Sequence, residues 1–276
     1  MCSYTQVMTA YALAGMPSLP SAFPTTDIVP GSASRPVPGL FPADRVLPVL
    51  PELTGLFPGG GLPLGGTILL GPARAPEVLV GAGFGAPAPS SALSNRVSGL
   101  TSLLLLLLAG ASSRGHWCAV AGLPELGLVA AVELGADLDR LVLVPCPGSE
   151  GRWQSVVTTL LETVDLVCLV PDAPVRPADA RRLSARARER RSTLVVLDAA
   201  SPTGVARGCP SDGQVRAGRI VARWPGPSDL RCSVKESSWS GLEHGHGLLS
   251  FRQLEAEVGG RGAASRPKSS RLRLPA

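Results

Sequence analysis

Short apolar runs alternate with helical patterns along the middle of the chain, and this alternation limits the possible folds more than any other feature. The apolar runs lie at 67–72, 117–121, 140–144, 166–170 and 193–197. Helical patterns lie at 100–112, 126–135, 152–164 and 178–191. A strand that is buried on both faces is apolar throughout, whereas a half-exposed strand alternates. We therefore expect an α/β fold with a mostly parallel central sheet that is covered by helices.

The two ends of the chain and one internal segment differ in composition from this middle part. Residues 1–35 are rich in Pro, Ser, Ala and Thr, which predicts a disordered extension. We expect a folded domain over 36–230, with a loop insertion at 73–98 that is rich in Gly, Pro, Ser and Ala. We expect 231–276 to be a separate C-terminal segment that ends, from Gly259, in a disordered basic tail.

The positive charge of the chain is concentrated in this tail. The formal net charge is +5, and 259–276 holds five basic residues and no acid, so the remaining charges balance. Lys235 and Lys268 are the only two lysines of the sequence, and all other basic residues are arginines. A site that needs a lysine before position 235 is therefore excluded.

Several features favour a reduced, cytoplasmic setting without membrane contact. The six cysteines form no C-x-x-C pair, and Cys118 and Cys168 lie within apolar runs, where Cys acts as a small hydrophobe. No basic residue precedes Arg35, so the positive start of a secretory signal is missing. The leucine run at 103–108 is much shorter than the roughly 20 residues of a membrane-spanning helix. We expect it to form a buried helix.

A parallel α/β domain invites comparison with phosphate-binding loops, which have the pattern G-x-x-x-x-G-K-[ST] between a strand and a helix. Backbone N–H groups and the lysine hold the phosphates, and the hydroxyl holds Mg²⁺. Here 27 residues separate Gly71 from Gly99, instead of four. Leu100 takes the lysine position, and only Thr101 and Ser102 retain suitable side chains. We therefore expect a degenerate loop, with no cofactor, no metal and no enzymatic activity.

Three segments resemble the RecA family over about residues 45–200. They are GLPLGGTI at 61–68, LGADLDRL at 134–141 and VDLVCLV at 164–170. More closely, the chain resembles the ImuA-type (ImuA prime) proteins of actinobacteria, which are RecA-like accessory subunits of the DNA-damage mutasome. The shared features are the PGGGL start, a leucine-rich helix after a degraded loop, an Arg-rich helix, a Trp/Gly/His segment at 239–247 and a basic tail.

The resemblance implies a RecA-like core and a non-catalytic role in the SOS response, DNA repair and translesion synthesis, supporting damage tolerance and induced mutagenesis. It implies an ImuB-type adaptor, similar to a Y-family polymerase, as the partner, with an error-prone C-family DNA polymerase and the sliding clamp reached through it. It also implies that the C-terminal segment at 231–276 binds a partner, and that the protein has a nucleoid-associated location. The lysine of RecA falls on Leu100, its water-activating glutamate near Leu123 and its Mg²⁺-associated aspartate on Val170, while Glu125 and Asp172 are each displaced by two positions.

Two groups of residues are candidates for contact with a partner or DNA. Arg182, Arg186 and Arg190 lie one turn apart on the Arg-rich helix, where they form either a solvated face or a site for DNA phosphates or an acidic partner. The second group lies in the C-terminal segment. It comprises Leu248, Leu249, Phe251, Arg252 and Leu254.

Two other functions remain open. One is a RecA-like cell-division inhibitor of the SOS response, which would also be non-enzymatic. The other is an atypical ATPase in which Arg74 or Arg96 replaces the lysine, although Arg fits a point-charge site less well. His244 and His246, with Cys232 as the nearest further ligand, supply too few groups for a metal site.

Overall fold

The computed structural model describes residues 46–72, 99–145, 152–171, 174–197, 224–243 and 246–275. The chain divides into two units, Met1–Arg35 and Pro36–Ala276, and every described residue belongs to the second unit. The extension expected at 1–35 and the insertion expected at 73–98 lie outside the described residues.

The alternating strands and helices predicted for the middle of the chain are present, with ends that differ by at most two residues. The strands are β3 (Thr67–Pro72), β4 (Cys118–Ala121), β5 (Leu141–Val144), β6 (Leu166–Leu169) and β7 (Thr193–Leu197). The helices are α4 (Leu100–Ser112), α5 (Leu128–Glu133), α6 (Arg152–Thr163) and α7 (Pro177–Arg190). The fold is therefore α/β, as the pattern of apolar runs predicts.

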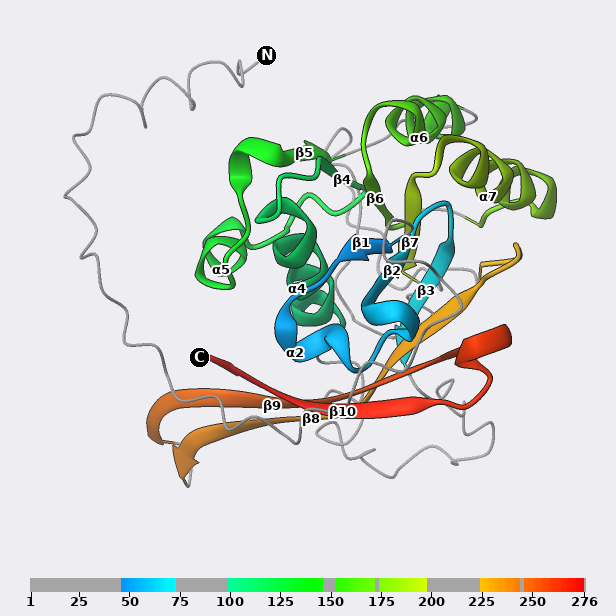
Figure 1. The fold of residues 1–276 in the computed structure, drawn as a ribbon. Helices are drawn as coiled ribbons and strands as arrows, with labels where there is room; N and C mark the ends of the chain where they lie inside the picture. Colours follow the sequence, from blue (N-terminus) through cyan, green and yellow to red (C-terminus); the bar gives the residue numbers. More distant parts are fainter. Residues whose placement is uncertain are drawn as a thin grey trace, which may run out of the picture. The chain divides into compact units, whose positions relative to one another are not determined.

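These strands join three C-terminal strands, β8 (Leu230–Glu243), β9 (His246–Gly260) and β10 (Lys268–Pro275), in one eight-stranded sheet. The order of the strands is β10-β9-β8-β3-β7-β6-β4-β5 (Figure 1). Every pair from β8 to β5 is parallel, whereas β9 and β10 are antiparallel to their neighbours. The sheet is thus mixed, and its larger part is parallel.

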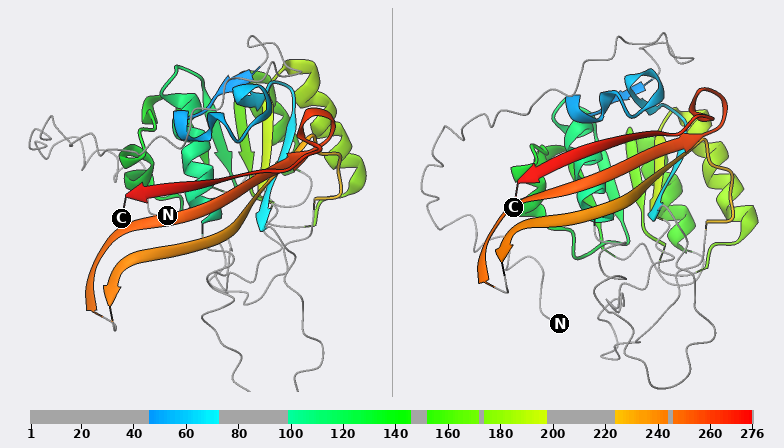
Figure 2. Two further views of the ribbon diagram at one scale, coloured as in Figure 1. Left: turned by 60° about the horizontal axis from the view of Figure 1, so that its bottom comes forward. Right: turned by 90° about the horizontal axis from the view of Figure 1, so that it is seen from below.

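Helices cover both faces of the parallel part (Figure 2). Ile68 and Leu70 of β3 belong to a cluster of buried side chains that includes α4, whereas Leu69 belongs to a second cluster that includes α6 and α7. Strands β6 and β7 alternate between the two clusters in the same way. Because each face is covered, these strands are apolar after the first threonine of β3 and of β7, and this accounts for the continuous runs in the sequence.

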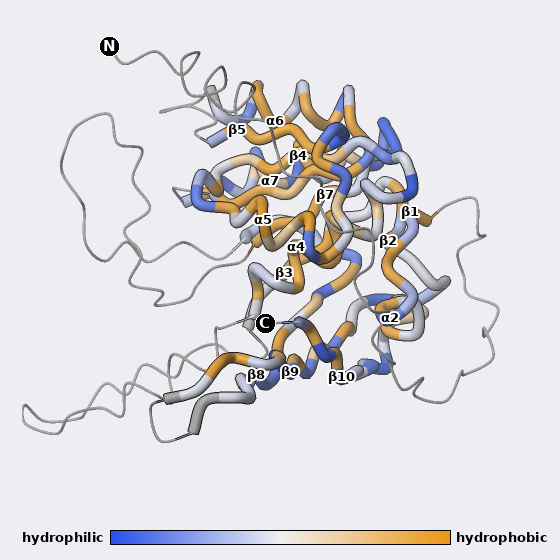
Figure 3. Tube along the Cα trace, turned by 90° about the vertical axis from the view of Figure 1, so that its left-hand side faces the viewer, coloured by the Kyte–Doolittle hydropathy of each residue, from blue (hydrophilic) through white to orange (hydrophobic). Residues whose placement is uncertain are grey.

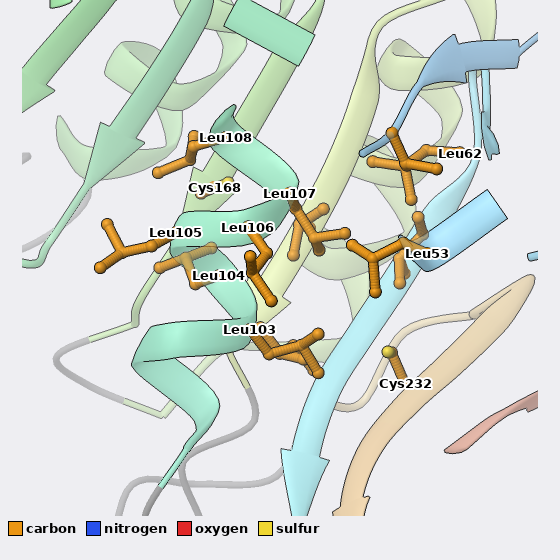
Figure 4. Close-up of a cluster of buried hydrophobic side chains, with 14 of the residues drawn as sticks. Leu53, Leu62, Leu103, Leu104, Leu105, Leu106, Leu107, Leu108, Cys168 and Cys232 are labelled. Atoms are coloured by element: carbon orange, nitrogen blue, oxygen red, sulfur yellow. The ribbon is translucent and has the colours of Figure 1, made fainter. Parts of the chain in front are cut away.

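Helix α4 is apolar around its whole circumference. Leu103–Leu108 are all between 0% and 5% exposed, and Figure 4 shows these leucines beside Leu53 and Leu62. An N-terminal layer made of β1 (Val46–Pro48), α2 (Pro51–Thr54) and β2 (Gly61–Pro63) supplies this cover. The layer crosses α4 at Gly110, where a Cβ atom would lie 2.7 Å from the Cα of Val49. The expected buried helix is confirmed, and among the described helices none is long and apolar enough to cross a membrane.

The expectation of a separate C-terminal segment with a disordered tail is wrong for the described residues. Strand β8 pairs with β3, and β10 pairs with β9 from Lys268 to Pro275. Leu272 and Leu274 are 4% and 7% exposed, whereas Arg271 and Arg273 between and beside them face solvent. This alternation of apolar and basic residues is typical of a strand with one buried face, and Figure 3 shows it along β8–β10. Because the tail is rich in basic residues, its composition does not reveal this alternation.

The cysteines of the sheet are part of the core, as the sequence predicts for Cys118 and Cys168. Both are buried, and Cys232 on β8 is buried as well. Burial raises the pKa of the Cys118 and Cys232 thiols to about 12. These side chains therefore remain neutral near pH 7 and pack as small apolar groups.

Replacement of Leu272 by alanine tests whether the C-terminal strand is packed. Leu272→Ala is expected to lower the free energy of unfolding by about 2–4 kcal/mol, because it removes a side chain from a filled core. Arg271→Ala is the matched control, since this side chain is 87% exposed, and it is expected to cost at most about 0.5 kcal/mol. Chemical denaturation of both variants gives the values. Equal, small effects would show that β10 is not part of the core.

Candidate functional site at the start of helix α4

Functional groups of parallel α/β proteins gather where the strands end, at their carboxyl edge. At this edge β4 and β6 run side by side, and the N–H of Val170 donates to the carbonyl of Ala121 at 2.9 Å. Gly122 follows β4 with a φ of 84°, and a Cβ atom there would lie 2.1 Å from the carbonyl oxygen of Val170. Only glycine allows this approach of the two chain segments. The edge is therefore tightly closed between these strands.

The positions that the resemblance assigns to the working residues of RecA hold buried apolar side chains. Leu100, Leu123 and Val170 are 4%, 6% and 1% exposed, and all three belong to the same hydrophobic cluster. Glu125 is exposed, and Asp172 lies outside the described residues. A phosphate or a metal ion placed among these three side chains would lose its hydration without gaining a charged partner from them, which is very costly. This arrangement suits packing and not charge stabilisation.

An arginine from the far end of the chain lies at the start of α4. The Arg252 Nη1 donates to the Ser102 hydroxyl at 3.0 Å, and its Nε donates to the Ser237 hydroxyl at 2.8 Å. The guanidinium carbon lies 4.8 Å from the centre of the Trp239 ring, in cation–π geometry. The side chain is 7% exposed, and burial lowers its pKa. Ser102 therefore contacts a cation of the chain itself, while the neighbouring Thr101 is exposed.

This placement corrects the expected role of Arg252 and Leu254 as partner-binding residues. Both are buried, at 7% and 0% exposure, and Leu254 packs in the main core. Their sequence positions on β9 alternate with exposed Gln253, so a strand pattern could have indicated that they face inward. No local signal could have indicated that Arg252 contacts Ser102, because 150 residues separate the two.

Gly99 makes the approach between α4 and β9 possible. It precedes the helix with a φ of 122°, and a Cβ atom there would lie 2.3 Å from the Leu254 Cδ1. The carbonyl of Gly99 accepts the first hydrogen bond of the helix from the N–H of Leu103, at 2.8 Å. The glycine that the sequence assigns to a degenerate phosphate loop is thus required here by conformation and space. Gly71, the other glycine of that pattern, lies in β3 and pairs with Ser233.

The Arg-rich helix α7 lies on the opposite face of the sheet. Ala180, Leu183 and Ala187 are buried against the sheet, as expected from their spacing. Arg182 and Arg190 are exposed. Arg186 is partly buried and forms ion pairs with Glu162 of α6 and Glu189 of α7, and its hydrogen bond is the main cause that lowers the pKa of Glu162. Of the three predicted contact residues, one is therefore already engaged within the domain.

Leu248 and Leu249 lie on an arm made of 235–243 of β8 and 246–250 of β9, and Phe251 lies at its base. Pairing of β8 with β3 stops at Val234. Strand β10 still flanks the arm as far as Phe251, which lies opposite Ser240, so only 241–243 and 246–250 extend beyond the rest of the sheet (Figure 2). The arm exposes large apolar side chains. Leu248, Leu249 and Trp239 are 86%, 42% and 45% exposed. Phe251 is partly buried, with the guanidinium of Arg273 3.8 Å from its ring centre.

The structure brings no metal-ligating cluster together within the described ranges, where no group of three or more His, Cys, Asp or Glu side chains could hold an ion. His244 lies outside these ranges, and the side chain of His246 is not described. Cys232, the nearest further ligand in the sequence, is buried in the main core with its pKa raised to about 12.

The fold and its closed edge define an α/β domain whose parallel part is similar to proteins of mycobacteria. Residues 87–203 match the family model of the MT3502 N-terminal domain. The uncharacterized protein Rv3395c of Mycobacterium tuberculosis is 43% identical over 103 residues, which are 37% of this chain and 50% of the relative. The chain thus matches about half the length of that relative. The family match contains α4 to β7 and ends before β8.

The close approach at Gly99 can be tested with a second glycine of positive φ. Gly99→Ala is expected to lower the free energy of unfolding by about 2–4 kcal/mol, because it adds steric conflict with Leu254 to the strain of a positive φ. Gly115 also has a positive φ, of 91°, but a Cβ atom there meets nothing within 4 Å.

Gly115→Ala is therefore the control, and it is expected to cost only the strain of about 1–2 kcal/mol. Thermal or chemical denaturation of the two variants measures the difference. If Gly99→Ala were no more destabilising than Gly115→Ala, the start of α4 would not be packed against β9.

Proposed function

We propose that the chain is a RecA-like, non-catalytic accessory subunit of a DNA-damage-inducible translesion-synthesis complex. In this role it supports damage tolerance and induced mutagenesis through protein–protein contacts in the cytoplasm, near the nucleoid. Its direct partner is an ImuB-type adaptor similar to a Y-family polymerase. The error-prone C-family polymerase and the sliding clamp are reached through that adaptor.

The observation that carries this proposal is the burial of Leu100, Leu123 and Val170 at one edge of the sheet. Phosphoryl transfer needs charge neutralisation, a metal ion and an oriented water at the same place. Leucine and valine supply none of these, and their burial in one cluster removes the space that such groups need. The resemblance to actinobacterial ImuA-type proteins agrees with the similarity to a mycobacterial relative.

The arm supplies the surface that such an accessory subunit needs. Large apolar side chains that are exposed together mark protein contact sites, since water contact with them is unfavourable. Leu248 and Leu249 are adjacent on β9, so their side chains project to opposite faces of the arm, and Trp239 lies on the strand that pairs with β9. We therefore assign the adaptor contact to the arm.

Nucleotide titration tests the non-catalytic part of the proposal. Purified full-length protein is expected to give no binding heat with ATP and Mg²⁺ in calorimetry, and no phosphate release above background. The reason is that Leu100, Leu123 and Val170 carry no charge at the positions where a lysine and two carboxylates would be needed. Binding or turnover that is abolished by Thr101→Ala would contradict the proposal and favour an atypical ATPase. Ser113→Ala, at an exposed position at the other end of α4, is the matched control.

Paired substitutions test the arm. Leu248→Ser with Leu249→Ser is expected to weaken binding to the adaptor at least about tenfold, as is typical for the loss of central apolar contacts. Val129→Ser with Val132→Ser is the control, because these side chains of α5 are 73% and 48% exposed. Co-purification and a binding titration compare the two double variants. Point changes are required, since truncation at 248 would remove core residues of β9 and β10 along with the arm.

The same variants in cells separate the proposal from a cell-division inhibitor. The arm variant is expected to lower the frequency of damage-induced mutation as much as deletion of the gene, with no change in cell length. A change in filament length with unchanged mutation frequency would favour the division inhibitor.

A further inference from the structure

The outer face of α7 is rich in exposed arginines. The exposed basic residues from 176 to 191 are Arg176, Arg181, Arg182, Arg188, Arg190 and Arg191. Four acids lie near them: Glu162 and Glu189 pair with the partly buried Arg186, Asp229 lies 4.0 Å from Arg188, and Asp179 is in the first turn of α7. Among the described acids none forms an ion pair with Arg181, Arg182 or Arg190. A strong positive potential therefore remains on this face.

The arginines flank the helix in two rows. At 3.6 residues per turn, Arg181 and Arg188 follow one flank of α7, and Arg182 follows the other flank beside Arg186. Ala178, Ala185 and Glu189 are exposed between the rows, and Glu189 pairs with Arg186. At the two alanines the backbone of α7 can approach a partner closely while long cationic side chains extend to either side. A major groove of B-DNA, about 12 Å wide with phosphates along both walls, has this complementary shape and charge.

The chemistry of the face favours a phosphate backbone over an acidic protein or a single strand. Protein interfaces have an apolar core, but the large apolar side chains that are exposed on the described part of the chain lie elsewhere, such as Val129, Trp239 and Leu248. Single-strand sites stack bases on exposed aromatic rings, and α7 has none. Arginines are the side chains that most suit contact with phosphate oxygens.

We infer that the outer face of α7 binds the phosphate backbone of duplex DNA without sequence preference. The contact is independent of the arm and of the adaptor, because α7 and the arm are formed by different elements. It would bring the domain to DNA through many weak, salt-dependent contacts rather than through base recognition.

Fluorescence anisotropy with the full-length protein and a labelled duplex of about 25 base pairs tests this inference between about 50 and 200 mM salt. The triple variant Arg181→Ala, Arg182→Ala, Arg190→Ala is expected to bind at least about tenfold more weakly at low salt, and to reduce the salt slope by about 2–3. The control is Arg261→Ala, Arg266→Ala, Lys268→Ala, which removes the same charge from exposed positions near β10 and should retain the slope. Circular dichroism and thermal melting verify that both variants are folded.

Each other outcome overturns the inference. Loss of binding in the control variant but not in the α7 variant would assign the contact to the C-terminal strand. Equal loss in both would indicate a general charge effect, and no binding by the unaltered protein would exclude the contact. Competition by polyglutamate as strong as that by unlabelled duplex would indicate an acidic protein as the partner. Adaptor binding is not measured in this experiment. A negative DNA-binding result would therefore not affect the proposed function, and a failure of the proposed function would not affect this inference.

Discussion

The burial of helix α4 on all sides is the constraint on which the rest of the described structure depends. A helix with leucines around its circumference cannot remain at a surface, because each leucine left in water costs on the order of 1.5–3 kcal/mol. The sheet covers one side, and α5, the N-terminal layer and the C-terminal strands contribute to the same cluster. The N-terminal layer and the C-terminal strands therefore both pack in one core with a helix from the middle of the chain.

This packing also determines the surroundings of the start of α4. A phosphate loop keeps the start of its helix open to water and to charge, since the backbone N–H groups must reach a ligand. In this chain Gly99, Leu100 and Ser102 instead contact β9 or the core. The start of α4 has thus become an internal contact between distant parts of the chain. That change is consistent with a domain that acts through its surfaces, as we propose.

The parallel half of the fold could be predicted from the sequence because its signals are local. The continuous runs of β3, β6 and β7 follow from burial on both faces, and helices with a clear period precede β6 and β7. The C-terminal strands could not be recognised in the same way, since Arg271 and Arg273 hide the alternation of Leu272 and Leu274 within a basic composition. At the candidate site, the sequence predicts only that the charged residues of a phosphate loop are missing. The strand alternation could indicate that Arg252 faces inward, but its contact with Ser102 depends on tertiary pairing and has no local signal.

Strand β9 is continuous from the core to the arm, and this continuity governs how the arm is oriented. Leu254, Ala256 and Val258 face the core, and Arg252 continues the same side of the strand toward Trp239, its partner on β8. A shift of the strand by one residue would turn each of these side chains outward. The packing of these core side chains therefore fixes the register of β9. It thereby also fixes the face of the arm on which Trp239 is exposed, although the core side chains themselves are buried.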